Sequence, residues 1–185
     1  MKQPASNGEK KMNLEKNELR IRNAEEKDAA QLARWWNDGG VMAHAGFPMG
    51  LGITAEEIVE KLKTDRDDVR RRLILEWQGK PIGEMSYTVL EGPIAEIGIK
   101  ICEAAYQEQG LGRRALSMLI HELFVRGCVK IILDTNLDNL RAQHVYEKLG
   151  FRKTGIRRDS WTDQLGQKQS AVDYELLPSD FMDFS

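Results

Sequence analysis

Alternating and periodic apolar positions divide most of the chain into short strands and helices. The strand segments alternate apolar and polar residues or run β-branched residues together, whereas the helical segments repeat apolar residues every three or four positions. Strands are predicted at 19–22, 72–78, 81–90, 94–101, 129–134, 151–161 and 169–176. Helices are predicted at 25–37, from 54 onward with Thr54 and Glu57 as a capping box, at 111–126 and at 137–148.

The lengths of the connections predict how these strands pair. Turns at 79–80 and 92–93 join the three strands between residues 72 and 101, and such short loops favour an antiparallel meander. The strand at 94–101, the helix after it and the strand at 129–134 form a right-handed crossover, so these two strands are parallel. The predicted fold class is therefore α/β, with a mixed and mostly antiparallel sheet.

The N-terminal stretch differs from the rest of the chain. Residues 1–17 are polar, rich in lysine and glutamate, and show neither helical nor strand periodicity. Such a segment cannot bury enough apolar surface to offset the entropy of ordering it. We therefore expect residues 1–17 to be a disordered tail and residues 18–185 to form a single domain.

Composition narrows the class of protein further. Of the 185 residues 41% are hydrophobic and 30% are charged, which is typical of a soluble globular protein, and the net charge of −2 gives no support for a nucleic-acid partner. No apolar run approaches the roughly 18 residues of a membrane helix, and no signal peptide is visible, so the cytoplasm is expected. Two cysteines and three scattered histidines lack the spacing of a metal site.

The stretch 107–116 carries the clearest chemical signal. Gly110 and Gly112 stand where the helix at 111–126 begins, and Arg113 and Arg114 come directly after them. The first backbone N–H groups of a helix have no internal partners, and glycine lets a phosphate approach them closely. This pattern predicts an anion site.

A dinucleotide fingerprint, G-x-G-x-x-G/A, also fits residues 110–115, with Asp134 roughly 20 residues on as the ribose ligand. Three observations argue against it. Residues 102–109 separate the glycines from their strand, most of the chain precedes the motif, and the remaining sequence is too short for the second half of a doubly wound sheet.

Two motifs resemble those of the GCN5-related N-acetyltransferases. Gln107-x-x-Gly110-x-Gly112 is similar to the family's pyrophosphate-binding motif, and residues 139–151 resemble its N-x-x-A-x-x-x-Y-E-K-x-G-F segment nearly residue for residue. The resemblance extends from about residue 19 to 177. The end of the first helix at 35–38 and the end of the last strand at 173–177 resemble the corresponding segments of the subgroup that includes ribosomal-protein N-terminal acetyltransferases.

This resemblance implies acetyl-CoA as co-substrate, and the spacing of the cysteines and histidines predicts no metal. It implies a sheet of about seven strands and about four helices, with a splayed pair formed by the strands 94–101 and 129–134. The pantetheine arm would pair with the backbone of the first of these strands. The residues implied for CoA binding are Ile99, Ile101, Gln107, Gln109, Gly110, Leu111, Gly112, Arg113, Arg114, Asn139 and Tyr146.

The resemblance also implies the catalytic groups. Tyr146 matches the family tyrosine that protonates the CoA thiolate. Some members keep a base glutamate at the spacing of Glu96, whereas others remove the proton of the amine through water; Glu84 on the neighbouring strand is a rival. The base therefore stays open between Glu96, Glu84 and water.

The acceptor side is expected to lie on the face of the sheet opposite CoA. Carboxylates and aromatic faces there would attract an ammonium group. The predicted acceptor-binding residues are Trp35, Asp38, Glu84 and Asp163. The expected acceptor is a small amine or a protein N-terminus, and polyamines, aminoglycosides and amino-acid-like metabolites are all candidates. The alternative function is a non-catalytic CoA-binding sensor module. Homodimers are common in the resembling families.

Overall fold

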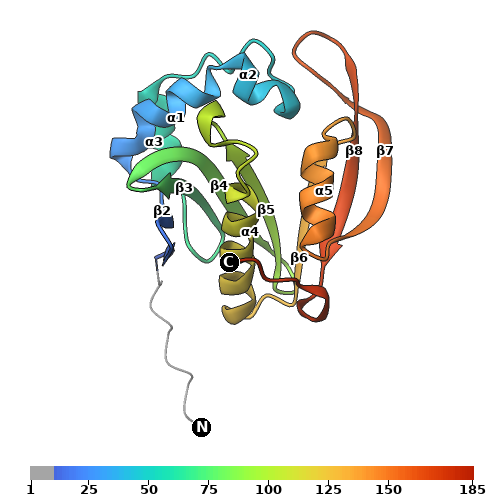
Figure 1. The fold of residues 1–185 in the computed structure, drawn as a ribbon. Helices are drawn as coiled ribbons and strands as arrows, with labels where there is room; N and C mark the ends of the chain where they lie inside the picture. Colours follow the sequence, from blue (N-terminus) through green and yellow to red (C-terminus); the bar gives the residue numbers. More distant parts are fainter. Residues whose placement is uncertain (1–10) are drawn as a thin grey trace.

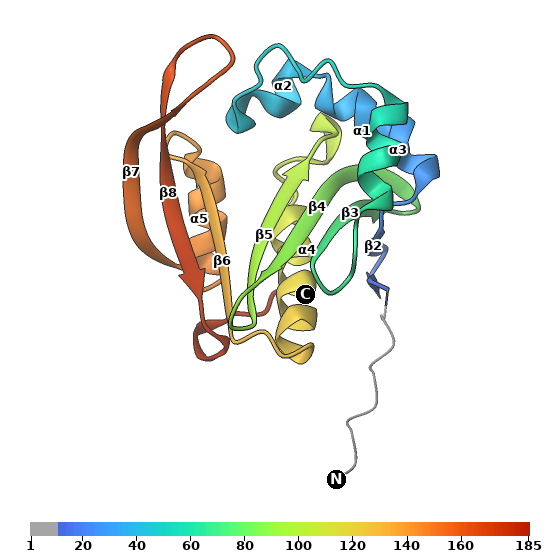
Figure 2. The ribbon, with the colours of Figure 1, turned by 180° about the vertical axis from the view of Figure 1, so that it is seen from behind.

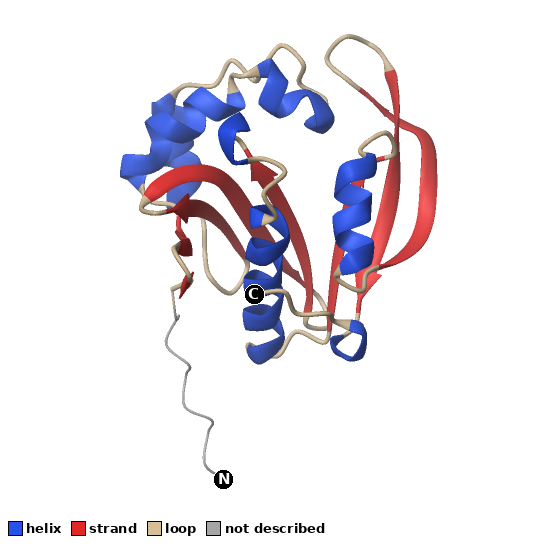
Figure 3. Cartoon of the chain, viewed as in Figure 1, coloured by secondary structure: helices blue, strands red, loops and turns tan. Residues whose placement is uncertain are grey.

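A computed structural model describes residues 11–185 (Figures 1 and 3). Eight strands form one sheet: β1 Asn13–Lys16, β2 Leu19–Asn23, β3 Arg70–Trp77, β4 Lys80–Leu90, β5 Ile94–Ile101, β6 Lys130–Asn136, β7 Arg152–Thr162 and β8 Lys168–Leu176. The α-helices are α1 Ala29–Trp36, α2 Gly39–Met42, α3 Ala55–Lys63, α4 Leu111–Val125 and α5 Leu140–Lys148. Short 3₁₀ turns are η1 Glu26–Asp28, η2 Ala43–Ala45, η3 Ala104–Tyr106 and η4 Pro178–Asp180.

The strand order in the sheet is β1-β2-β3-β4-β5-β6-β8-β7. Every neighbouring pair is antiparallel except β5 and β6, which are parallel and joined through α4. The predicted meander, the predicted crossover and the mixed, mostly antiparallel sheet are confirmed. The sheet has one strand more than expected, β1, and the short helix α2 is an addition to the four expected helices.

Helices cover both faces of the sheet, as Figures 1 and 2 show from opposite sides. Side chains alternate between the faces along each strand. On β3, Leu73 and Leu75 belong to the larger apolar core with α4, whereas Ile74 belongs to a second core with α1 and α3. The Thr54–Glu57 capping box at the start of α3 is present as predicted. Within residues 11–185, no helix combines the length and apolarity that a membrane span requires.

The prediction of a disordered tail at 1–17 is wrong from residue 12 onward, and residues 1–10 lie outside the described residues. Residues 13–16 form β1, which pairs with β2 from Asn13↔Arg22 to Lys16↔Leu19. Met12 is only 1% exposed, and its N–H donates to Asn23 Oδ1 at 3.1 Å. An edge strand with polar side chains in solvent needs no apolar alternation, so the sequence pattern failed to reveal it.

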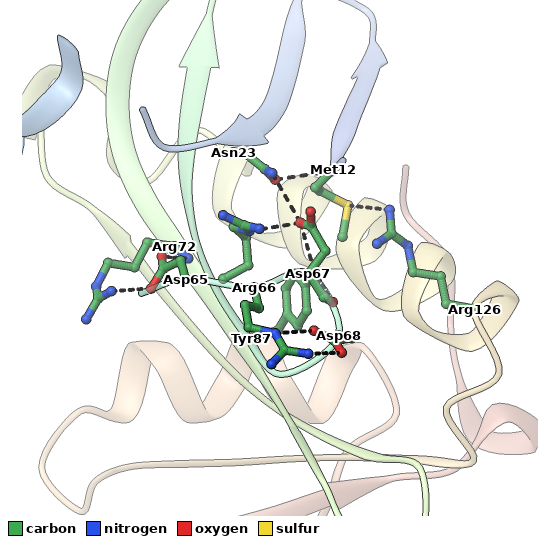
Figure 4. A network of polar contacts seen from close by, with 10 residues as sticks. Met12, Asn23, Asp65, Arg66, Asp67, Asp68, Arg72, Tyr87 and Arg126 are labelled. Carbon is green, nitrogen blue, oxygen red and sulfur yellow. Dashed lines mark hydrogen bonds and ion pairs between the residues drawn. The ribbon is translucent and has the colours of Figure 1, made fainter. Parts of the chain in front are cut away.

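A polar network fixes the loop that leads from α3 into β3 (Figure 4). Asn23 Nδ2 donates to Asp67 Oδ1 at 3.1 Å, and the Tyr87 hydroxyl donates to the Asp67 carbonyl at 2.9 Å. Asp65 accepts hydrogen bonds from the backbone N–H and the guanidinium of Arg72. These contacts hold the start of β3, and with it Arg70 and Arg72, in a defined position.

A buried ionic cluster links β2, the turn η1 and β3. The Arg22 guanidinium donates to both Asp28 oxygens at 2.7 and 2.8 Å and to Glu76 Oε1 at 2.8 Å. Burial alone raises the pKa of Asp28, but the hydrogen bonds from Arg22 and the Glu25 N–H outweigh it, so the pKa ends below its usual value. The charged form of Asp28 is therefore favoured by folding.

We expect Asp28→Asn to lower the free energy of unfolding at pH 7 by about 3 kcal/mol, because it leaves a buried guanidinium without its main partner. The wild-type protein should lose stability as the pH falls below about 4, where the Asp28 carboxylate becomes protonated, and the variant should lose less over that range. Urea unfolding between pH 3 and 7 measures both effects. Glu60→Gln, which breaks an exposed pair with Lys63, is the control and should cost under about 1 kcal/mol.

Candidate active site

The parallel strands β5 and β6 pair over only part of their length, and they diverge toward the top of Figure 1. Their register runs from Ile94↔Lys130 to Glu96↔Ile132, although β5 continues to Ile101. The predicted splayed pair is therefore present. Backbone groups alternate along β5, and Cys102 N–H points at β4 by donating to Ile82 O. By the same alternation, Ile99 and Ile101 direct their N–H and C=O groups away from β4, toward the divergence.

A cleft of about 1670 Å³ opens at this divergence. Side chains from both faces of the sheet line it, because the gap between the strands interrupts the sheet: Ile99 comes from one face, and Ser86 and Lys100 come from the other. The walls also include the start of α4, the length of α5, and α2 with the residues around it. The interrupted sheet thus gives one continuous space that two molecules can enter from opposite sides.

The N-terminus of α4 lies at one end of this cleft. Gly110 caps the helix with φ at +76°, a left-handed conformation that favours glycine. A Cβ built on Gly112 would meet Ile101 Cγ1 at 3.7 Å, an ordinary contact, so the free fold leaves room there. Leu111 is buried in the core, and Gln109 donates to the Ala105 carbonyl. The predicted glycines therefore lie at an accessible helix N-terminus.

The two arginines directly after the glycines point in different directions. Arg113 lines the cleft, lies 4.3 Å from the centre of the Phe184 ring, and keeps a buried Nε without a hydrogen-bond partner among residues 11–185. Arg114 instead lies over the Trp77 ring and donates to Asn17 O. Arg114 is therefore not among the cleft-lining side chains, because the turn of the helix rotates it toward the β1–β2 hairpin.

Sequence reasoning missed Arg141, which lines the cleft from α5. Its guanidinium donates to Glu108 at 2.8 Å and to Gln107 Oε1 at 3.3 Å, and Gln107 in turn donates to Ile101 O at 2.9 Å. Gln107 thus ties the glycine turn to the end of β5. The adjacency of Arg141 to the conspicuous Asn139 was the available signal, but only the fold brings α5 beside the turn.

Asn139 and Tyr146 mark the two ends of α5 in the cleft. Asn139 caps the helix through a hydrogen bond from Ala142 N–H at 3.2 Å. Tyr146 is 7% exposed, lines the cleft, and packs edge-on against Phe151 and Tyr174. Burial, and then the charge of Asp134, raise the pKa of Tyr146 to about 12. Its hydroxyl therefore stays protonated at neutral pH.

The two candidate base residues occupy different places on one face of the sheet. Glu84 lines the cleft and accepts hydrogen bonds from Trp36 Nε1 at 2.9 Å and Lys100 Nζ at 3.0 Å. Glu96 is exposed and lines a separate cavity of about 250 Å³ with Asp134 and Arg157. Because β5 and β6 still pair at Glu96, this side chain lies before the cleft opens, and its placement disfavours it as the base.

Three of the predicted acceptor residues lie elsewhere than expected. Trp35 is 2% exposed and donates its indole N–H to Glu103 at 2.7 Å, so its ring belongs to the second core. Asp38 caps α2 by accepting from Gly40 and Val41 N–H. Asp163 accepts from two backbone N–H groups of its own turn and from Gln169. The carboxylates of Asp38 and Asp163 serve local structure, whereas the Trp35 indole anchors α1 to Glu103. Trp36 takes the place at the cleft expected for Trp35.

The two segments expected to line the acceptor side do meet. Gln164, in the β7–β8 turn, donates its N–H to Gly46 O at 2.9 Å and its amide to Gly50 O at 2.9 Å. Trp161 fills the space beside Gly46, where a Cβ would come within 2.4 Å of its ring. In Figure 1 this hairpin rises toward α2. Across residues 11–185, His, Cys, Asp and Glu side chains form no group of three that suits a metal ion.

Comparison with known proteins agrees with this arrangement. The model of the acetyltransferase (GNAT) domain family matches residues 18–152. The ribosomal protein bS18-alanine N-acetyltransferase of Escherichia coli K12 is 39% identical over 67 residues, 36% of this chain and 45% of that protein. A mycothiol acetyltransferase of Catenulispora acidiphila is 26% identical over 125 residues, 64% of this chain and 40% of that protein. The chain thus spans less than half the length of these relatives.

Solved structures share the fold. The spermidine N-acetyltransferase of Vibrio cholerae, solved with CoA and spermine, superposes with a TM-score of 0.76 at 23% identity, covering 88% of this chain and 97% of that one. RimL, a ribosomal L7/L12 α-N-protein acetyltransferase, gives 0.76 at 16% identity, covering 88% and 91%. The sheet divided at a parallel strand pair, the glycine turn at the helix N-terminus and the family match together lead to one conclusion: this chain belongs to the GNAT acetyltransferase family.

Proposed function

We propose that this protein transfers the acetyl group of acetyl-CoA directly to a primary amine. The observation that carries the proposal is the single cleft that passes through the sheet where β5 and β6 diverge. Free backbone N–H groups at the start of α4 and the buried Nε of Arg113 lie at one end of the cleft. The Glu84 carboxylate lies on the opposite face of the sheet. A thioester and an amine can therefore meet from two sides.

The residues present fit the parts of acetyl-CoA. The N-terminus of α4, with Gly110 and Gly112, suits the pyrophosphate, and Arg113 and Arg141 add positive charge beside it. Ile99 and Ile101 offer backbone groups to the amides of the pantetheine arm, although the Ile101 carbonyl already accepts from Gln107. The Ile99 N–H is our candidate for stabilising the oxyanion that develops on the thioester.

Tyr146 and Glu84 would handle the protons. The neutral Tyr146 hydroxyl can donate to the sulfur as negative charge develops on it, and its raised pKa keeps the donor present through neutral pH. Glu84 uses only part of its acceptor capacity on Trp36 and Lys100, so it can also accept a hydrogen from the incoming amine. Holding the amine against the thioester supplies much of the remaining rate.

The phosphate end is tested by Gly112→Val. The free fold accommodates a Cβ here, so the variant should fold, but the added methyl groups would occupy the space beside the helix N-terminus. We expect the KM for acetyl-CoA to rise at least ~10-fold, equivalent to about 1.4 kcal/mol. Gly155→Ala on β7, where a Cβ meets nothing closer than 3.9 Å, is the control. Unchanged acetyl-CoA affinity in folded Gly112→Val would reject the assignment.

Tyr146→Phe keeps the ring packing and removes the donor. We expect kcat to fall by roughly 10²-fold or more while CoA still binds, as measured by calorimetry. The raised pKa adds a second expectation: the ratio of wild-type to variant kcat should stay constant from about pH 7 to pH 10, where an ordinary tyrosine would be about half deprotonated. A kcat within about twofold of the parent would assign Tyr146 to packing alone.

The base is tested by comparing two amide substitutions on the same face of the sheet. Glu84→Gln preserves shape and removes the charge inside the cleft, so the kcat/KM for the amine should fall at least ~10-fold with little change in the acetyl-CoA KM. Glu96→Gln should stay within about twofold, because that side chain lies outside the cleft. If Glu96→Gln is the more damaging change, the base has been misassigned; if neither matters, water removes the proton.

A further inference from the structure

The acceptor side of the cleft carries more positive than negative side chains. This side is built by α3, the meander strands β3 and β4, and the outer end of β5. The charged residues that line it on these elements are the cations Lys61, Arg70, Arg72 and Lys100 and the carboxylates Glu57 and Glu84. Asp134 of β6 lines the cleft on the same face of the sheet and pairs with Arg157. This differs from the carboxylate-rich wall that the sequence led us to expect.

Two of these cations have partners inside the protein. Lys100 pairs with Glu84, whose other oxygen accepts from the Trp36 indole. Arg72 pairs with Asp65, which is nearly fully buried (Figure 4). Glu57 uses one oxygen to cap α3 by accepting from the Thr54 N–H. The carboxylates near this wall are thus already engaged, and a polyammonium ligand would find few free acceptors.

Lys61 and Arg70 are different, because both are exposed and neither has an ion-pair partner within residues 11–185. Arg70 also repels the nearby Arg72. Burial lowers the pKa of Arg72, the negative charge of Asp65 raises it, and the positive charge of Arg70 lowers it, so that the pKa ends below its usual value. An anion bound between these side chains would relieve that repulsion. The wall therefore offers unpaired positive charge to whatever enters.

The register of the sheet sets the distance from Glu84, where the amine would lie, to Arg70 and Arg72. Glu84 lies opposite Ile74, and Arg72 and Arg70 lie on the same face of β3, two and four residues away. At ~3.4 Å per residue, these arginines start about 7 and 14 Å from the Glu84 row. An extended peptide whose amino group lies at Glu84 would bring its third to fifth residues beside them.

We propose that the acceptor is the amino terminus of an acidic peptide segment, held by Lys61, Arg70 and Arg72 while its amine lies at Glu84. This inference rests on the proposed function and narrows it to one class of acceptor. It separates this protein from polyamine acetylation, because a polycation whose reacting amine lies at Glu84 would hold its other positive charges beside Lys61 and Arg70.

The test uses three peptides that differ only in charge. All begin Ala-Ala and carry two glutamates, two glutamines or two lysines at positions 3 and 5, with glycine at position 4 and an amidated C-terminus, and spermidine is added as a polycation. We expect kcat/KM for the glutamate peptide to exceed that for the glutamine peptide by at least about fivefold, with the lysine peptide and spermidine lower still. The advantage should shrink as salt screens the exposed charges.

Charge reversal assigns the effect to the wall. Arg70→Glu and Lys61→Glu should each abolish the preference for glutamate over lysine without changing the KM for acetyl-CoA. Lys63→Glu is the matched control, because Lys63 lies on the same helix as Lys61 but outside the cleft and pairs with Glu60. Equal use of all three peptides, a preference for the lysine peptide or spermidine, or an undiminished glutamate preference in Arg70→Glu would overturn the proposal.

Binding separates this inference from the proposed function. Calorimetry of each peptide with the CoA-bound protein reports charge preference even if no acetyl group is transferred. Tighter binding of the glutamate peptide supports the proposal, and failure of all peptides to bind overturns it. Preserved acetyl-CoA binding with no transfer to any amine, together with selective binding of the glutamate peptide, would instead reject the transferase and leave the acidic-peptide site standing.

Discussion

Pairing between β5 and β6 ends at Glu96, and the rest of the site depends on that break. In a closed sheet, the backbone groups of Ile99 would be used by the neighbouring strand. Here β4 holds one edge of β5 while the other edge faces the cleft, and Gln107 takes only the Ile101 carbonyl. A buried backbone group without a partner costs free energy, so such an edge persists where a ligand or water can satisfy it.

The walls of the cleft come from parts of the chain that lie far apart in sequence. Trp35 and Trp36 both anchor α1 through their indole N–H groups, one to Glu103 beyond β5 and one to Glu84 on β4. Gln164 joins the β7–β8 turn to the residues after α2. Each contact lets one side chain both pack and donate a hydrogen bond. The space is thereby given a fixed shape before any ligand enters.

Charge on the acceptor side is set by pairing rather than by composition. The chain has nearly equal numbers of acidic and basic residues, but Asp38 and Asp163 are used by caps and turns, whereas Lys61 and Arg70 keep no partner in the described part of the chain. Asp and Asn side chains favour such local hydrogen bonds to nearby backbone N–H groups. Counting carboxylates near a predicted site therefore overestimated its negative charge.

The sequence by itself determined the order of elements, the meander, the parallel crossover, the glycine turn and the family motif around Tyr146, because these depend on local periodicity, turn chemistry and short-range spacing. It missed β1, whose edge position needs no apolar alternation. Only the tertiary structure separated Arg113 from Arg114, Trp36 from Trp35 and Glu84 from Glu96. Neighbouring or equivalent residues in sequence differ in which face they present and what they meet, and that is decided by packing between distant segments.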